Sequence, residues 1–360
     1  GTIFSITIAA LSLAAGQMGP RLLRNFTRDR GNQFTLGVFL ATFSYALLVL
    51  RSVRTEQEGI FIPRLGLSVG MLMAFLCVAT LVYFVNHMAN RINVDTVVDL
   101  VSDDIRAAMK RLTSDTASPS PPPTAFWRNA VAVADPRSGY LQQLDADGLA
   151  DWAALHGTAI RLVVRPGDFV FPGAPFAIMT VPVEGAQAAI RNATALSATN
   201  SSAVDVEYAV RQLVEVAVRA LSPGINDPNT AMSVLDRLGA VLCALAGLHL
   251  PSGVLLRDDQ VALWVPSTSY RNYLDLMFHM IRQNAGGSTP VLIHLLKVLT
   301  AVASCETGVG RKRELLRHTE LVWSDAQRDV ANEADLEDIG DYRAIFLRVM
   351  EGGAIEVLRH

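Results

Sequence analysis

The segment from Arg219 to Thr230, with the sequence RALSPGINDPNT, contains the polar residues with the clearest potential for chemistry. A guanidinium, a hydroxyl and a side-chain amide come close together just before a predicted helix. The free N–H groups at the start of a helix favour anions. We therefore expect this segment to bind an anionic ligand, and the candidate residues are Arg219, Ser222, Asn226, Asp227 and Thr230.

The same segment also has the composition of a sharp turn between two helices. Pro223 and Gly224 would end the first helix, because proline lacks a backbone donor and glycine adopts turn conformations easily. Asp227 followed by Pro228 is typical of a helix N-cap and its first position. A structural turn accounts for these four residues but not for the guanidinium, hydroxyl and amide, so both interpretations stay open.

Familiar catalytic patterns are absent from the sequence. It has no glycine-rich phosphate-binding loop, no GxSxG nucleophile motif and no HExxH zinc motif. The seven histidines do not occur at metal-ligand spacing, and Cys77, Cys243 and Cys305 are scattered among apolar residues. We therefore predict no catalytic residue, no metal site and no cofactor. Cysteines of this kind fit a reducing compartment.

Charge and hydropathy indicate a membrane protein rather than a nucleic-acid-binding one. The formal net charge is −3, so the chain lacks the basic excess that nucleic-acid phosphates attract. The mean hydropathy is +0.30, and the apolar residues concentrate in residues 1–90. The lipid bilayer is therefore the first expected partner.

Residues 1–90 are predicted to form the transmembrane segment. Leu65–Val85 is an uncharged run of 21 residues, and a helix of that length spans the roughly 30 Å of a hydrocarbon core. Phe34–Leu50 is a second apolar span, and residues 3–18 look like the end of a third. Because the chain opens at Gly1 in an apolar stretch, we expect the 3–18 span to be truncated.

Small and hydroxylated residues within the two full spans suit close helix packing or a narrow pore. No charged residue lies inside either span to mark an ion path. The candidate pore or helix-packing positions are Gly37, Thr42, Ser44, Ser68, Gly70 and Thr80.

The arginines in the connecting segments predict the orientation. Residues 19–33 carry four arginines and one acid, whereas residues 51–64 carry three arginines and two acids. Positive charge concentrates on the cytoplasmic side of bacterial membranes, so residues 19–33 should be cytoplasmic. Two crossings later the chain returns to that side, which predicts a multi-pass inner-membrane protein with a cytoplasmic soluble region.

Three regions follow the transmembrane segment, and the predicted fold class is a membrane α-helical segment plus a cytoplasmic α+β region. Residues 91–125 are interpreted as an amphipathic exit helix and a proline-rich linker, and residues 203–360 as a helical domain. Hydrophobic periodicity in this domain predicts a short extended stretch at 253–265 and helices at 204–221, 228–248, 268–284, 289–305, 309–331 and 336–351. Residues 126–185 read as a small β-barrel or sandwich-like domain, in which the turn Arg165–Asp168 resembles those of biotinyl and lipoyl carriers. Residues 111–296 contain no lysine, which excludes a carrier function but not the scaffold.

Two groups of motifs are distinctive enough to indicate a family, one beside the membrane spans and one in the helical region. They are Gly19–Arg24, Arg30–Leu40 with Tyr45, and Arg219–Pro228 with Thr230–Ala231 and Asp236–Leu238. They resemble the bacterial membrane family DUF2254. The resemblance implies an inner-membrane location and four N-terminal membrane helices, part of which would precede Gly1. It implies no activity.

Two functional interpretations follow. The first is a homo-oligomeric channel or transport-type assembly, because a short membrane segment, an exit helix, a β-domain and a helical domain match the general plan of bacterial channels. The second is a membrane-tethered sensor or scaffold that binds an anionic ligand or a protein partner through its helical domain. An enzyme is a third and weaker interpretation, since the sequence shows no nucleophile, metal site or paired acid and base.

Overall fold

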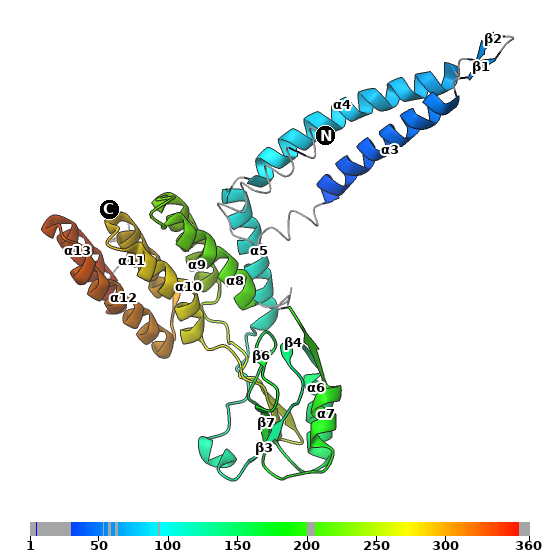
Figure 1. Cartoon of the computed structure of the whole chain (residues 1–360). Helices are drawn as coiled ribbons and strands as arrows, with labels where there is room; N and C mark the ends of the chain where they lie inside the picture. The colour runs from blue at the N-terminus through cyan, green and yellow to red at the C-terminus, as the bar shows by residue number, and fades with distance from the viewer. Residues whose placement is uncertain are drawn as a thin grey trace.

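The computed structural model describes residues 30–52, 54–56, 59–61, 64–92, 94–199 and 206–352, together with Ser5. A helical hairpin, a β-rich domain and a bundle of helices make up these residues (Figure 1). The architecture is α+β with two apolar helices near the N-terminus, as expected. The predicted span at 3–18 and the motif Gly19–Arg24 lie outside the described residues.

The hairpin consists of α3 (Arg30–Ser52) and α4 (Arg64–Ile92), joined by the antiparallel strands β1 (Arg54–Glu56) and β2 (Gly59–Phe61). Within the described residues, Arg30–Ser52 and Arg64–His87 are the two helices long and apolar enough to cross a membrane. Of the most apolar 18-residue stretch in each helix, only 6% is buried. A core helix of a soluble protein would be mostly buried. The apolar side chains that face outward suit a lipid environment, and the spans predicted at 34–50 and 65–85 lie within these helices.

Helix α5 (Val94–Leu112) follows α4 and packs into the bundle of helices. Val98, Val101, Ile105 and Met109 recur at helical spacing and are buried against α8 and α9. The sequence predicted this amphipathic helix but treated it as an exit helix separate from the helical domain. The structure instead makes α5 part of that domain's core, because its apolar face is buried there.

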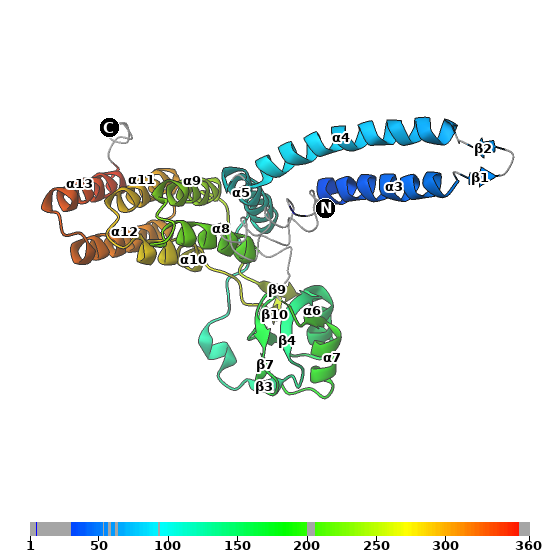
Figure 2. The ribbon, with the colours of Figure 1, turned by 45° about the horizontal axis from the view of Figure 1, so that its top comes forward.

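The bundle comprises three consecutive helix pairs stacked in two layers (Figure 2). One layer contains α9, α11 and α13, and the other contains α8, α10 and α12. The pairs are α8 (Val206–Ala220) with α9 (Pro228–Ala244), α10 (Tyr270–Ala285) with α11 (Thr289–Cys305), and α12 (Val309–Asp329) with α13 (Glu333–Met350). Each of these helices overlaps the one predicted from hydrophobic periodicity.

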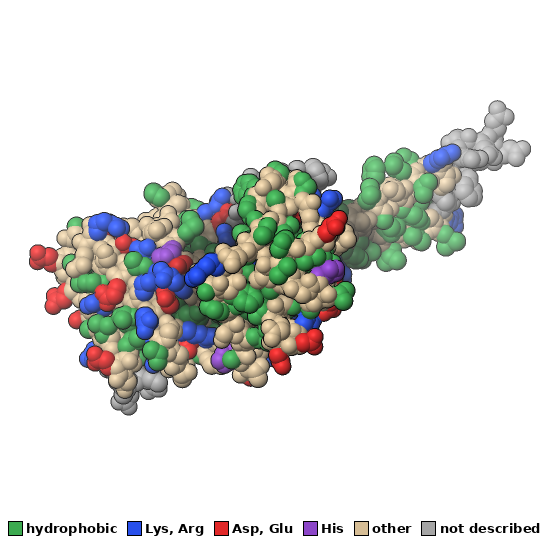
Figure 3. All heavy atoms as spheres, turned by 90° about the horizontal axis from the view of Figure 1, so that it is seen from below, with side chains coloured by type: hydrophobic (Ala, Val, Ile, Leu, Met, Phe, Trp, Pro, Cys, Tyr) green, Lys and Arg blue, Asp and Glu red, His purple; other side chains and the backbone are tan. Residues whose placement is uncertain are grey.

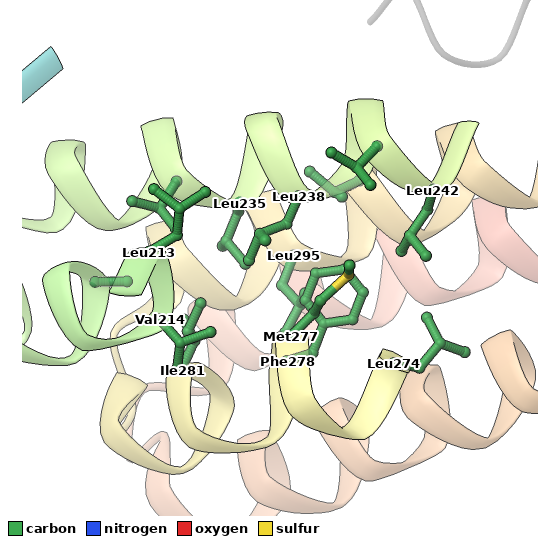
Figure 4. Close-up of a cluster of buried hydrophobic side chains, with 14 of the residues drawn as sticks. Leu213, Val214, Leu235, Leu238, Leu242, Leu274, Met277, Phe278, Ile281 and Leu295 are labelled. Carbon is green, nitrogen blue, oxygen red and sulfur yellow. The ribbon is translucent and has the colours of Figure 1, made fainter. Parts of the chain in front are cut away.

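The core of the bundle is formed by aliphatic residues and Phe from the two layers. Leu238 of α9, Met277 of α10 and Leu295 of α11 point into the same space (Figure 4). All three side chains are at most 1% exposed. Full burial of such a side chain contributes about 1.5–3 kcal/mol, so this core rather than polar contacts holds the layers together.

The β-rich domain contains two sheets that share one hydrophobic core. Leu141 and Val170 from one sheet pack with Ile160, Phe176 and Leu263 from the other. Its elements are η1 (Thr124–Trp127), β3 (Val131–Ala134), β4 (Gly139–Leu144), α6 (Ala146–Leu155), β5 (Ile160–Leu162), β6 (Phe169–Val170), β7 (Pro175–Met179), α7 (Ala186–Asn192), β8 (Thr194–Ser197), β9 (Val254–Arg257) and β10 (Gln260–Trp264). A barrel or sandwich classification of these sheets stays a prediction.

Strand order shows that the domain is discontinuous in sequence. The five-stranded sheet has the order β3-β7-β5-β10-β9, and the three-stranded sheet has the order β6-β4-β8. Strands β9 and β10 lie between α9 and α10 in sequence, yet β10 pairs in parallel with β5, Leu263 opposite Ile160. The sequence predicted an extended stretch at 253–265 but not its partner, because a pairing so distant in sequence leaves no local signal.

Candidate functional sites

The turn from Arg219 to Thr230 connects α8 to α9, and hydrogen bonds within it occupy several candidate residues. Ser222 Oγ donates to the Arg219 carbonyl at 2.6 Å. The Asp227 side chain caps α9 by accepting from Thr230 N at 3.2 Å and from Thr230 Oγ1 at 2.6 Å. These contacts support the interpretation as a helix–helix turn, while anion binding there stays a prediction.

Asn226 is the unusual residue of this turn. Its φ is 50°, in the left-handed region, and its side chain is exposed. Asparagine tolerates this conformation better than most residues, but glycine adopts it at no steric cost. Replacement by glycine would therefore keep this backbone conformation while removing the side-chain amide.

The six predicted packing or pore positions divide between two faces of the hairpin. Thr42, Gly70 and Thr80 lie at least partly covered between α3 and α4. Gly37, Ser44 and Ser68 are exposed on the outside, and an added Cβ at Gly37 would meet nothing within 4 Å. Only the first three therefore pack α3 against α4.

Polar contacts fix the register of the two helices. Tyr45 Oη donates to the Gly66 carbonyl at 3.0 Å, and Cys77 Sγ donates to Thr42 Oγ1 at 3.2 Å. An added Cβ at Gly70 would lie 3.7 Å from the Tyr45 ring, so the glycine admits the aromatic side chain. A hydrogen bond between helices holds register well in lipid, where water does not compete.

A cleft of about 880 Å³ lies where the β-rich domain meets α5, α8 and α10. Its lining combines apolar side chains with a small number of polar ones. The lining residues are Leu112, Gln142, Gln143, Leu144, Asp145, Arg165, Pro166, Val206, Glu207, Pro251, Gly253, Val265, Pro266, Ser267, Thr268 and Tyr273.

An ion pair at this cleft ties the two soluble parts together. Arg165 comes from the predicted turn of the β-rich domain, and Arg165 Nη2 donates to Glu207 Oε2 of α8 at 2.9 Å. Thr268, just before α10, also donates to Glu207. Glu207 is only 12% exposed, so its charge is compensated mainly by Arg165. The sequence identified the turn but not its ionic partner.

Comparison with known proteins identifies the family. Residues 1–301 match the family model described as "Predicted membrane protein (DUF2254)". The chain belongs to this family. An uncharacterized protein of Mycobacterium tuberculosis is 34% identical over 359 residues, which cover 93% of this chain and 67% of the relative. An uncharacterized protein of Mycobacterium bovis matches to the same extent, and no solved structure matches.

Three potential metal ligands meet between α10 and α12 of this DUF2254 chain. Asp275 Oδ1 lies 3.0 Å from His279 Nε2 and 2.9 Å from His318 Nε2. One ligand atom from each residue lies within 4.8 Å of the others. The His318 side chain is fully buried, whereas Asp275 and His279 are 28% and 31% exposed.

The sequence did not reveal this group, although part of its signal was present. Asp275 and His279 are four residues apart on one helix, which places them on the same face. The spacing of the histidines alone does not indicate this pair, because only one of its members is a histidine. His318 comes from another helix, and it lies beyond residues 1–301, which the family model covers.

The surroundings of the group are rich in charge. Arg317 donates to Asp275 and, through Nε at 2.7 Å, to Glu314 Oε2. Arg282 and Asp325 form a buried ion pair between the same two helices. Acidic, basic and histidine side chains gather over the bundle on the face shown in Figure 3.

These contacts determine the protonation of the group. Burial lowers the pKa of His318 to about 4 and also lowers the pKa of His279. Burial alone would raise the pKa of Asp275, but hydrogen bonds from Arg317 and His318 outweigh it and lower this pKa. At neutral pH the group therefore consists of one carboxylate and two neutral imidazoles.

Proposed function

We propose that the protein is a homo-oligomeric channel or transport-type assembly of the bacterial inner membrane, with its soluble region in the cytoplasm. The observation that carries the proposal is a hydrophobic contact between the membrane hairpin and the bundle. Phe84, near the end of α4, is 1% exposed and belongs to the same hydrophobic cluster as α5, α8 and α9. A movement of the bundle would therefore be transmitted to α4 through this contact.

The outer face of the hairpin supports contact with further membrane helices. Gly37, Ala41 and Ser44 form an exposed line of small residues on α3, with the spacing that lets helix backbones approach closely. This line faces away from α4, so a helix of another copy would fit against it. In an assembly these positions would lie at the contacts between subunits.

The antiparallel hairpin supports the proposed orientation. Because α3 and α4 run in opposite directions, the start of α3 and the end of α4 lie on one side of the membrane. The arginine-rich residues 19–33 lead into the start of α3, and the soluble region follows α4. Positive residues favour the cytoplasm, so the soluble region is assigned to the same side.

A cross-linking experiment in native membranes tests the assembly. Ser44→Cys, in a chain whose three native cysteines are replaced by serine, should form intermolecular disulfides because Ser44 faces outward. Thr42→Cys is the matched control, since Thr42 lies against Cys77 within the hairpin and should not cross-link between chains. Purified oligomer should also conduct ions or permit solute flux in planar bilayers. Monomeric protein in nanodiscs without conductance or flux would overturn the proposal.

A second candidate function is a membrane-tethered sensor or scaffold that binds an anionic ligand or partner at Arg219–Thr230. The exposed left-handed Asn226 favours it, because unusual backbone conformations concentrate at functional sites. Asn226→Gly preserves the turn but removes the amide. Inorganic phosphate or ATP should raise the melting temperature of the native full chain in detergent and have a smaller effect on this variant. No stabilisation of the native chain by either probe would exclude this function.

A further inference from the structure

The group formed by Asp275, His279 and His318 has the dimensions of a metal site. Metal–nitrogen and metal–oxygen bonds of about 2.0–2.2 Å give neighbouring ligand atoms a separation of roughly 3.0–3.4 Å. The two Nε2 atoms lie 3.0 Å and 2.9 Å from Asp275 Oδ1. These two separations lie near the lower end of that range, and all three donor atoms lie within 4.8 Å of one another, close enough for one ion to reach them together.

The donors are also in the protonation state that a metal requires. Neutral imidazole and ionised carboxylate bind metal ions, and their protonated forms do not. Both imidazoles are neutral at neutral pH because burial lowers their pKa values. On the side of the imidazoles, binding would therefore require a change of tautomer that frees each Nε2 lone pair.

The change of tautomer breaks no strong hydrogen bond at Nδ1 of either ring. His318 Nδ1 is buried and has no hydrogen-bond partner among the described residues. His279 Nδ1 accepts only a long contact of 3.4 Å from Arg282 Nη2, and this weak contact is the one that a proton on Nδ1 would remove. Moving the proton from Nε2 to Nδ1 thus leaves the strong contacts outside the group unchanged.

Arg317 would compete with a bound metal ion for the carboxylate of Asp275. Its guanidinium donates to the same Asp275 Oδ1 toward which both imidazoles point. An arriving cation must displace this contact, because two positive charges would otherwise share one carboxylate oxygen. Glu314, which already accepts from Arg317 Nε at 2.7 Å, can keep the displaced guanidinium paired.

We propose that Asp275, His279 and His318 bind a divalent transition-metal ion that links α10 to α12. Two imidazoles and one carboxylate suit Zn²⁺ and the neighbouring first-row ions rather than Mg²⁺ or Ca²⁺, which prefer oxygen ligands. Three protein ligands leave room for water to complete the coordination. Because His318 is buried on α12 and the other two ligands lie on α10, the ion joins two neighbouring helices of the bundle.

Equilibrium dialysis against buffered Zn²⁺ tests the site on the full chain in detergent, after treatment with a chelator. We expect one high-affinity ion per chain and a higher melting temperature with Zn²⁺ but not with Mg²⁺. His279→Ala, a change at a partly exposed side chain, should weaken binding at least about tenfold because it removes one of three ligands. Co²⁺ should give visible absorption typical of nitrogen and oxygen ligation.

Two further variants separate a metal site from an ordinary polar cluster. His294→Ala is the matched control, because His294 Nε2 also lies 2.7 Å from a carboxylate, Asp236 Oδ1, but without a second imidazole. It should leave Zn²⁺ affinity unchanged. Arg317→Gln should tighten Zn²⁺ binding by removing the competing cation. Absence of stoichiometric Zn²⁺ binding to the native chain, or equal loss of affinity in His279→Ala and His294→Ala, would overturn the proposal.

Discussion

Individual charged residues show how the β-rich domain tolerates a buried carboxylate. The side chain of Asp135 is 2% exposed, and Arg137 Nη2 donates to Asp135 Oδ2 at 2.6 Å. Arg137 Nη2 also reaches Thr194 Oγ1 at 2.7 Å, which ties the start of the domain to β8. Burial alone would raise the pKa of Asp135, but the hydrogen bonds and charge of Arg137 outweigh it and lower this pKa.

The lowered pKa of Asp135 predicts how the stability of the domain depends on pH. The folded-state pKa lies below the unfolded value of about 3.9, so the ion pair contributes stability above that pH and loses it as the carboxylate is protonated. Asp135→Asn should lower the free energy of unfolding by about 2 kcal/mol at pH 7. Denaturant unfolding should show a smaller difference between the two chains at pH 3. An equal difference at both pH values would contradict this assignment.

At the residue scale the sequence predicted contacts between neighbouring residues well, and contacts between residues far apart in the sequence poorly. The capping of α9 by Asp227 and the turn at Arg165–Asp168 follow from neighbouring residues. Asp275 and His318 belong to different helices, so only the packing of α10 against α12 brings them together. Likewise, no sequence pattern pairs Arg165 with Glu207.

At the scale of elements, hydrophobic periodicity located all six helices from α8 to α13, because each buries an apolar stripe. The short helix α7 and strand β8 were missed. Both are too short for a periodic pattern to emerge, and residues 186–195 are half alanine, which gives little contrast between apolar and polar positions.

The contact between α9 and α11 gives a testable prediction about helix packing. An added Cβ at Gly239 would lie 2.5 Å from Val298 Cγ1, too close for a stiff β-branched neighbour to avoid. Gly239→Ala should therefore cost about 1–3 kcal/mol despite the better helix propensity of alanine. In a Val298→Ala background the same change should cost nothing or stabilise the protein.

Gly310→Ala is the control for that prediction. Gly310 is also helical, but an added Cβ there would meet nothing within 4 Å. Thermal unfolding of the full chain in detergent should show a neutral or higher melting temperature for Gly310→Ala. If Gly239→Ala is equally neutral, the close approach of α9 and α11 is not a determinant of stability.

At the scale of the whole molecule, native cysteines report which side of the membrane the soluble region occupies. Cys305 is exposed, while Cys77 lies within the hairpin. Burial, together with the adjacent Cys305, raises the pKa of Cys243 to about 12, so its thiol stays protonated and unreactive. A membrane-impermeant maleimide should label Cys305 in inside-out vesicles and not in intact spheroplasts.

The reverse pattern is expected at the other end of the hairpin. Ser52, the last residue of α3, is exposed, and Ser52→Cys in a Cys305→Ser background places a thiol there. This thiol should react in spheroplasts and be protected in inside-out vesicles. Labelling of Cys305 from outside intact spheroplasts would assign the opposite orientation to the protein.

The insertion of β10 beside β5 has a consequence for how the protein is made. A ribosome completes β5 at Leu162 but does not reach β10 until residues 260–264, after α8 and α9 have been synthesised. The edge of β5 that later pairs with β10 therefore stays unpaired while α8 and α9 are synthesised. Exposed strand edges are prone to pairing with other chains. During translation the β-rich domain therefore cannot mature before its helical neighbour begins to form. A chain that ends between Ser197 and Gln260 would lack β10 and leave that edge of β5 open.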